Sequence, residues 1–161
     1  MGVSGSGKTT VGSALAAALG WRFVDADQHH APESVAKMAR GEPLTDADRW
    51  PWLDRLRAII AAALAADERL VVACSALKAA YRARLVGGDA QRIRFVHLTG
   101  TPELLRARLE ARPGHFMKPG MLASQLAALE PPDDAVTVDV ALPVGALVAD
   151  IVSRLTRASG L

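Results

Sequence analysis

The chain has 161 residues, the size of a single domain (1–161), and half of them are hydrophobic, which is enough for a sizeable core. The formal net charge is only +2 and the aromatic content is 4%, so the basic, aromatic surface of a nucleic-acid-binding protein is not expected. The single cysteine, Cys74, excludes an internal disulfide and fits a cytoplasmic protein, and the most apolar run, 58–66, is far shorter than the roughly 20 residues of a membrane span.

Apolar runs alternate with helical patterns along the chain, which predicts β-α-β units around a parallel sheet. A helix is expected from Gly7 to Leu19, ended by Gly20, and a strand over 22–26 should pair in parallel with a second strand over 70–74. The remaining expected elements are a short helix over 32–40, a longer helix capped by Asp46, a helix from Leu77, a strand over 93–98, a helix capped by Thr101, a strand over 136–140 and a final helix opened by Pro143.

The stretch GVSGSGKT, Gly2 to Thr9, matches the phosphate-binding pattern G-x-x-x-x-G-K-[ST]. Its glycines let backbone N–H groups close around phosphate oxygens, and the helix that follows adds the positive end of its dipole. Lys8 is predicted to act in catalysis by reaching the β and γ phosphates of ATP, and the Thr9 hydroxyl to bind Mg²⁺. The alternative is a flexible linker, but a linker is rarely followed by a clean amphipathic helix. The residues predicted to bind ATP here are Gly2, Val3, Ser4, Gly5, Ser6, Gly7, Lys8, Thr9 and Thr10.

A phosphate-binding loop normally follows a strand at the centre of the sheet, and in this sequence only Met1 precedes it. We therefore expect the functional protein to carry a strand upstream of Met1. Without such a strand, the two neighbouring strands would leave backbone N–H and C=O groups unpaired, at about 1–3 kcal/mol each.

The stretch DADQHH, at 25–30, places two carboxylates and two histidines at the end of a predicted strand. A right-handed β-α-β connection brings this strand end beside the phosphate-binding loop. Three interpretations are open: a zinc site, a surface turn, or catalysis. Adjacent His29 and His30 diverge in regular structure, which disfavours zinc. In the catalytic interpretation one carboxylate orders the water shell of Mg²⁺ and the other accepts a substrate proton.

Seven blocks, in order, resemble the thermoresistant gluconokinase family, a branch of the P-loop small-molecule kinases that also includes shikimate kinase. They are GVSGSGKT, LGWRFVDADQHH, KMARGEPLTDADRWPWL, CSALKAAYRARL, FVHLTG, RLEARPGHFM and SQLAALEPP. The resemblance implies a three-layer α/β/α fold with a parallel sheet flanked by helices, a helical substrate-binding insertion at about 31–66 and a small lid at about 112–125. It also implies transfer of the ATP γ-phosphate to the 6-hydroxyl of D-gluconate, with Mg²⁺, and often a homodimer.

The resemblance also implies roles for single residues. Asp27 matches the second acid of the family's D-x-D motif, as the base or hydroxyl anchor, and Asp25 matches the first, facing the Mg²⁺ waters; which of them is the base stays open. Arg112, at the hinge of the lid, would contribute its charge to the transferring phosphate. The other residues that the blocks implicate are His30, Lys37, His115 and Gln125 for substrate or lid contacts and Arg108 for the nucleotide.

Recognition of gluconate requires a cation for its carboxylate and hydrogen-bonding groups for its hydroxyls. Arg49 is the best candidate for the carboxylate, because a guanidinium group matches it with two parallel bonds. Lys78 and Arg82, just past a predicted strand end, are the alternatives.

Two rival functions remain open. The first is a kinase for another small hydroxy acid such as shikimate, or for a nucleotide, although the block KMARGEPLTDADRWPWL does not resemble a base-binding slot. The second is a nucleotide-dependent switch without phosphoryl transfer, but the N-K-x-D motif of switch GTPases does not occur in the sequence.

Overall fold

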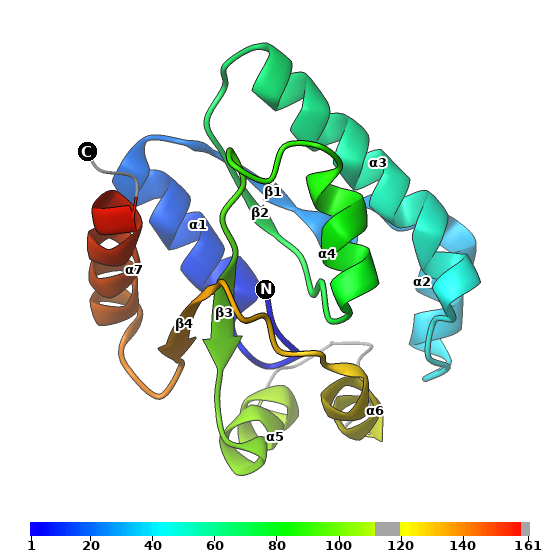
Figure 1. Cartoon of the computed structure of the whole chain (residues 1–161). Coiled ribbons are helices and arrows are strands. Elements are labelled where there is room, and N and C mark those ends of the chain that lie inside the picture. Colours follow the sequence, from blue (N-terminus) through cyan, green and yellow to red (C-terminus); the bar gives the residue numbers. More distant parts are fainter. Residues whose placement is uncertain (112–119, 159–161) are drawn as a thin grey trace.

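The computed structural model of the chain describes residues 1–111 and 120–158. Helices and strands alternate along it in the order predicted for β-α-β units (Figure 1). The elements are α1 (Lys8–Leu19), β1 (Arg22–Asp25), the 3-10 helix η1 (Ala26–His29), α2 (Pro32–Ala39), α3 (Asp46–Ala65), β2 (Leu70–Ala73), α4 (Ala79–Val86), β3 (Val96–Thr99), α5 (Pro102–Glu110), α6 (Gly120–Ala128), β4 (Val136–Asp139) and α7 (Val144–Ala158).

The strands form two parallel pairs. In the first pair β1 lies beside β2, with Arg22 opposite Leu70 and Asp25 opposite Ala73. In the second pair β3 lies beside β4, from Val96 opposite Val136 onward. The predicted parallel pairing of the strands near 22–26 and 70–74 is therefore confirmed.

The two pairs are separated along most of their length. Among the described residues, β2 and β3 do not pair with each other, and a cavity of about 490 Å³ is lined by both of them. We call this cavity the interstrand gap. One end of it is bridged by Met1, whose amino group donates to the Val96 carbonyl (2.5 Å) and whose carbonyl accepts from the Leu98 N–H (2.9 Å). At the same end the Gly2 N–H donates to the Ser75 carbonyl, at 3.2 Å.

The helices cover the strands from both sides. Figure 1 shows α1 and α7 on one side of the strands, and α3 and α4 on the other. On α7, Leu147 and Ile151 are four residues apart, so they share a helix face, and both are buried in a core with side chains of α1, α5 and β3. A second core joins α3 and α4 to the end of β2 through Trp52, Leu56 and Tyr81, among others. This is the three-layer α/β/α arrangement that was predicted.

Some predicted boundaries were wrong. The long helix is capped by Thr45 and not by Asp46: the Thr45 hydroxyl accepts from the Asp48 N–H, and the Asp48 carboxylate accepts from the Thr45 N–H. Asp46 is the first residue inside the helix, which leaves its side chain free to reach α4. The helix expected from Leu77 begins at Ala79, and neither η1 nor α6 was predicted.

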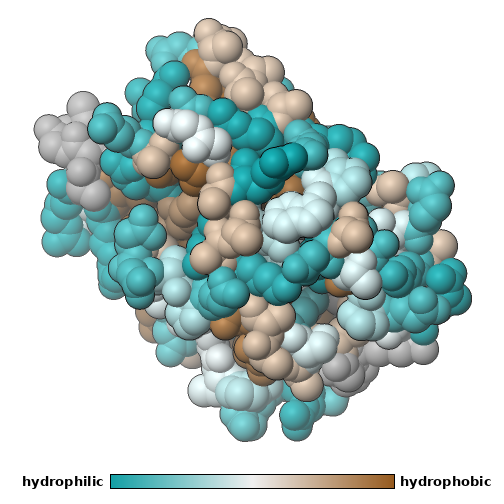
Figure 2. Space-filling view, turned by 45° about the vertical axis from the view of Figure 1, so that its right-hand side comes forward, coloured by the Kyte–Doolittle hydropathy of each residue, from teal (hydrophilic) through white to brown (hydrophobic). Residues whose placement is uncertain are grey.

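None of the described helices is long and apolar enough to cross a bilayer. On the face shown in Figure 2, hydrophobic residues are scattered among hydrophilic ones.

Candidate functional site

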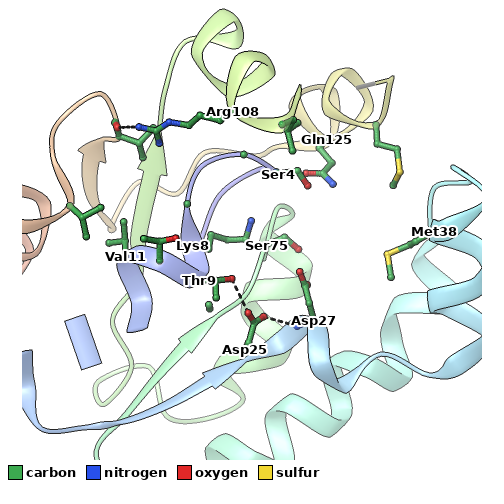
Figure 3. Close-up of a pocket in the computed structure, with 18 of the residues that line it drawn as sticks. Ser4, Lys8, Thr9, Val11, Asp25, Asp27, Met38, Ser75, Arg108 and Gln125 are labelled. Carbon is green, nitrogen blue, oxygen red and sulfur yellow. Dashed lines mark hydrogen bonds between the residues drawn. The ribbon is translucent and has the colours of Figure 1, made fainter. Parts of the chain in front are cut away.

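A cavity of about 330 Å³ lies between the phosphate-binding loop, the ends of β1 and β2, and the helices α2 and α3 (Figure 3). It brings together most of the residues predicted from the sequence. Those that line it are Ser4, Gly5, Gly7, Lys8, Thr9, Thr10, Asp25, Asp27, His30, Arg49, Arg108 and Gln125. The predicted site residues Gly2, Val3 and Ser6 are buried behind this wall and do not line it.

The phosphate-binding loop is braced from behind by α5. Gly5 has a positive φ of 81°, and a Cβ at this position would lie 2.7 Å from the Leu105 carbonyl oxygen, so only glycine allows this approach. The Lys8 ammonium group folds back over the loop and donates to the Val3 carbonyl, at 3.0 Å. The loop thus presents a cation and the first turn of α1 to the cavity, which together suit a phosphate group.

The two predicted carboxylates meet the loop as expected. Asp25, the last residue of β1, accepts through Oδ2 from the Thr9 hydroxyl (2.8 Å) and through Oδ1 from the Asp27 N–H (3.1 Å). Asp27 follows in η1, and its side chain points toward the cavity from the same edge (Figure 3). Asp25 is therefore fixed by the backbone and the loop, whereas the Asp27 side chain is half-exposed and faces the open space.

The donor set of Thr9 and Asp25 fits Mg²⁺, because this cation prefers oxygen ligands and usually keeps several waters with only one or two protein carboxylates. The Thr9 and Asp25 oxygens are already 2.8 Å apart, which places both at one point of the cavity wall. Within residues 1–111 and 120–158, no three His, Cys, Asp or Glu side chains form a group that could hold a metal ion.

His30 lines the cavity with a side chain that is only 4% exposed. Its ring stacks on Trp52 with the ring centroids 4.3 Å apart, and Trp52 is itself fixed by a hydrogen bond to the Ala26 carbonyl, at 2.7 Å. His30 Nε2 lies 4.0 Å from Asp27 Oδ1, while Nδ1 is buried with no hydrogen-bond partner in the described part of the chain. Burial lowers the pKa of His30, which favours a neutral ring beside the carboxylate.

Three of the predicted substrate cations are held by the protein itself. Lys37 pairs with Asp48 (2.7 Å) and Lys78 with Asp46 (2.8 Å), while the Arg82 guanidinium donates to two backbone carbonyls at the end of β2. None of the three lines the cavity. Hydrogen bonds from Lys37 and from Thr45 lower the pKa of Asp48 to about 2, so this carboxylate stays charged at neutral pH.

Arg49 differs from these three cations in its position and in its pairing. It lines the cavity, and among the described residues no carboxylate pairs with its guanidinium group. Its guanidinium group lies over the Tyr81 ring, whose centroid is 5.8 Å from Arg49 Cζ. A guanidinium placed in this way is ready to meet an anion in the cavity.

Arg108 and Gln125 border the phosphate-binding loop from α5 and α6. Arg108 donates to the Val140 carbonyl (2.7 Å), and one of its nitrogens would lie 3.9 Å from a Cβ at Gly7. Gln125 is 8% exposed and accepts from the Ser4 N–H, at 2.7 Å. Gln125 therefore contacts the phosphate-binding loop, a contact that the sequence did not predict.

Two predicted site residues, Arg112 and His115, lie outside the described residues. The same holds for most of the predicted lid at about 112–125, of which the described part is the first six residues of α6. Their roles stay predictions.

The cavity also includes residues that sequence reasoning missed. Ser75 follows β2 and faces the cavity opposite Lys8, and Met38 and Leu44 form the wall on the side of α2 and α3 (Figure 3). Beyond Arg108, the wall contains two exposed apolar side chains, Leu142 (51% exposed) and Val144 (37%). The apolar pair directly after the last predicted strand, in VALPV, is the signal that could have revealed this part of the site.

Cys74 is the residue before Ser75, and it is buried. Burial raises the pKa of its thiol to about 11, so the group stays protonated near neutral pH. Cys74 is therefore a packed residue of the core.

Comparisons with known proteins find relatives in sequence and in structure. The family model described as shikimate kinase matches residues 4–128. The chain is 49% identical to the gluconokinase of Gluconobacter oxydans over 134 residues, which cover 83% of this chain and 75% of that protein. It is 40% identical to the thermoresistant gluconokinase of Escherichia coli strain K12, covering 98% of this chain and 91% of that protein. The crystal structure of a gluconokinase from Sinorhizobium meliloti 1021 matches with a TM-score of 0.86 and 45% identity, covering 98% of this chain and 90% of that one.

Proposed function

Because the chain belongs to the gluconokinase family of P-loop kinases, we propose that it transfers the γ-phosphate of ATP to the 6-hydroxyl of D-gluconate, giving 6-phospho-D-gluconate and ADP. The observation that carries the proposal is one cavity with a phosphate-binding loop at one end, two carboxylates at its edge and an arginine without a carboxylate partner among the described residues at the other. These three features match the phosphates, the reacting hydroxyl and the carboxylate of the two substrates.

ATP would bind with its phosphates on the loop and its base beyond Arg108. The loop N–H groups and Lys8 face the phosphates, and the exposed side chains of Leu142 and Val144 form an apolar wall beside the Arg108 guanidinium. A flat base fits between an apolar wall and a guanidinium plane, because both stack on its faces. This arrangement leaves the γ-phosphate nearest to Asp27.

In the proposed reaction the oxygen of the 6-hydroxyl forms a bond to the γ-phosphorus, and the bond from that phosphorus to the β–γ bridging oxygen breaks. The hydroxyl proton passes to the Asp27 carboxylate and from there to solvent, and ADP leaves with the bridging oxygen. Asp27 suits this role because it is half-exposed at the cavity edge and its backbone N–H is anchored on Asp25. Arg112 is proposed to stabilise the transferring phosphoryl group, as an arginine does in related transfers.

Mg²⁺ would be held by the Thr9 hydroxyl and, through its waters, by Asp25. When bound, this cation neutralises charge on the phosphate oxygens. The hydrogen bond between Thr9 and Asp25 keeps their two oxygens together at that point of the site.

The carboxylate of gluconate is proposed to bind Arg49. The other cations considered for this role are occupied, since Lys37 and Lys78 are paired with Asp48 and Asp46 and Arg82 binds backbone carbonyls. His30 lines the same space and would contact substrate hydroxyls, while Gln125 borders it and holds the phosphate-binding loop. The proposal also includes a homodimer that acts in the cytoplasm, with neither nucleic acid nor a membrane as partner.

An assay that couples 6-phosphogluconate formation to its dehydrogenase, with ADP release measured in parallel, tests the proposed function. We expect ATP- and gluconate-dependent product, which the variant Lys8→Ala should lose while keeping its thermal unfolding midpoint. A panel with shikimate and other hydroxy acids is the comparison. Phosphorylation of another acid in preference to gluconate, or ATP binding without any transfer, would contradict the proposal.

A further inference from the structure

The end of α6 and the two residues after it contact two separate loops of the site. Gln125 reaches the phosphate-binding loop, and Glu130 reaches the turn between β2 and α4. We call residues 125–130 the strut. Neither contact is needed to hold the strut in the core, because its leucines Leu126 and Leu129 already pack against the first core cluster.

The contact of Gln125 fixes one backbone group of the phosphate-binding loop. Its side-chain oxygen accepts from the Ser4 N–H at 2.7 Å, between two residues that are each less than 9% exposed. A buried N–H that lost this acceptor would cost about 1–3 kcal/mol, so the loop is held in the conformation that keeps it. Figure 3 shows the two side chains next to each other at the top of the cavity.

Glu130 makes two hydrogen bonds to the turn between β2 and α4. Its carboxylate accepts from the N–H of Ala79, the first residue of α4, at 2.6 Å, and its own N–H donates to the Leu77 carbonyl, at 2.9 Å. A carboxylate at the first turn of a helix also interacts favourably with the helix dipole. Glu130 therefore satisfies the first N–H group of α4 and is itself held by the turn before this helix.

The turn between β2 and α4 contains a residue with a strained backbone, Ala76. Ala76 has a φ of 45°, in the left-handed region that disfavours residues with a Cβ, and it is only 1% exposed. Its carbonyl accepts from Arg82, which also donates to the Leu77 carbonyl. Such a conformation persists only when its surroundings enforce it.

The strained turn places Ser75 at the cavity. The Ser75 side chain faces Lys8 and Asp27 (Figure 3), and its carbonyl accepts from the N–H of Gly2 at the start of the phosphate-binding loop. The phosphate-binding loop, the turn and the strut are thus connected in a closed ring of hydrogen bonds. Within such a ring, displacement of one member displaces the other two.

We propose that Gln125 and Glu130 are positioning residues that set the distance between the phosphate-binding loop and Ser75, so that the acceptor hydroxyl and not water meets the γ-phosphate. The inference rests on the proposed phosphoryl transfer. A misplacement of about 1 Å at a reacting centre can cost on the order of 10² in rate. A site loosened at this point also leaves room for water, which takes the phosphoryl group to inorganic phosphate.

The test measures ADP formed per molecule of phosphorylated acceptor, together with kcat and KM for both substrates. In the parent protein the ratio should be close to one. In Glu130→Ala and in Gln125→Met, which keeps the length of the side chain and removes its acceptor, we expect the ratio to rise at least twofold. In both variants kcat should fall about tenfold or more while KM for ATP stays within about threefold.

Three further variants sharpen the test. Glu130→Gln keeps an oxygen acceptor for the Ala79 N–H and should restore a ratio close to one. Glu130→Asp keeps the charge but is one methylene shorter, so it should give an intermediate ratio, and it serves if Glu130→Ala does not fold. Asp54→Ala removes an exposed ion pair between α3 and Arg84 of α4 outside the ring, and it should leave the ratio unchanged.

A ratio that stays close to one in Glu130→Ala and Gln125→Met, with kcat no lower than in Asp54→Ala, would overturn the inference. Failure of the proposed function is seen separately, in the parent protein. If the parent phosphorylates an acid other than gluconate, the ratio is measured with that acid and the inference is decided in the same way.

Discussion

At the scale of single residues, Asp27 and Asp25 share one strand end but differ in what holds them. Asp25 is engaged by the Thr9 hydroxyl and by the Asp27 N–H, so its oxygens are committed, whereas the Asp27 carboxylate faces the cavity. A group that must take a proton from the substrate needs such access. We therefore propose Asp27 as the base, between two acids that the sequence left open.

The variant Asp27→Asn keeps the size and shape of this side chain and removes its charge. We expect turnover to fall by roughly 10²-fold or more, because the proton acceptor is lost, while KM for gluconate changes much less. Steady-state kinetics with both substrates varied would measure this. Near-normal turnover would move the role of the base to Asp25.

Arg49 allows an equally direct prediction. Because no described carboxylate pairs with it and it lines the cavity, Arg49→Ala should raise KM for gluconate about 10- to 100-fold, the size of a lost charged hydrogen bond. KM for ATP should stay within a few-fold. Lys78→Met is the matched variant, since it removes a cation that is already paired with Asp46. A larger rise in KM for gluconate in Lys78→Met than in Arg49→Ala would place the substrate carboxylate at α4.

At the scale of elements, the start of α3 connects the two helices on the proposed substrate side. Asp48 accepts from the Thr45 N–H and also pairs with Lys37 of α2, so one carboxylate caps α3 and ties α2 to it. Arg49 is the next residue, and its N–H bonds to the Thr45 carbonyl. The Thr45 cap and Arg49, the proposed substrate cation, therefore belong to the same first turn of α3.

Thr45→Ala should lower the free energy of unfolding by about 1 kcal/mol and also raise KM for gluconate, because the first turn of α3 loosens around Arg49. Urea denaturation and kinetics measure the two effects. Thr101→Ala is the control, since Thr101 caps α5 by the same kind of bond, to the Leu104 N–H. A similar loss of stability without a change in KM is expected there. An unchanged KM in Thr45→Ala would separate the cap from substrate binding.

The elements also show what sequence reasoning can reach. Local signals were sufficient for α1, which ends at Gly20 as predicted, and for α5, which is capped by Thr101 with Pro102 at its first position. The glycine-rich loop and the acids at the end of β1 were placed side by side correctly, because the β-α-β connection fixes which strand ends meet. Thr45 and Asp46 are both good capping residues, so composition alone could not choose between them.

The missed parts of the site depend on contacts between distant residues. The pairing of Lys78 with Asp46 spans 32 residues and that of Glu130 with Ala79 spans 51, and neither leaves a periodic trace in the sequence. A sequence shows that Lys78 and Arg82 are cations. Only the fold shows that Lys78 is paired with Asp46 and that Arg82 donates to backbone carbonyls. For the same reason the strained turn at Ala76 could not be predicted, since alanine is not a residue that signals a left-handed conformation.

At the scale of the whole molecule, stability should depend on pH through two buried histidines. Burial lowers the pKa of His30, which faces Asp27, Arg49 and Arg55, and of His97, which lies near Arg82. Both rings are therefore favoured neutral in the folded state, and the unfolded state binds more protons below the ordinary pKa of about 6.5. Their contribution to stability is full above that pH and is lost as pH falls through the lowered folded-state values.

Urea denaturation should thus give a smaller free energy of unfolding at pH 5 than at pH 7.5. The difference should shrink in a variant that carries His30→Gln and His97→Gln, because neither side chain can then take up a proton. A pH dependence that is the same in this variant and in the parent would assign the effect to other groups.

The interstrand gap has a consequence for motion. Among the described residues, β2 and β3 are joined through the bridge made by Met1 and Gly2 and not by a continuous ladder of backbone hydrogen bonds. In a protein made of residues 1–161 alone, the two halves should behave as separate units in native-state hydrogen exchange, each opening with its own free energy. Amides of β2 and β3 that point into the gap should exchange sooner than those within the β1–β2 and β3–β4 ladders. Equally slow exchange on both sides of these strands would mean that the halves open together.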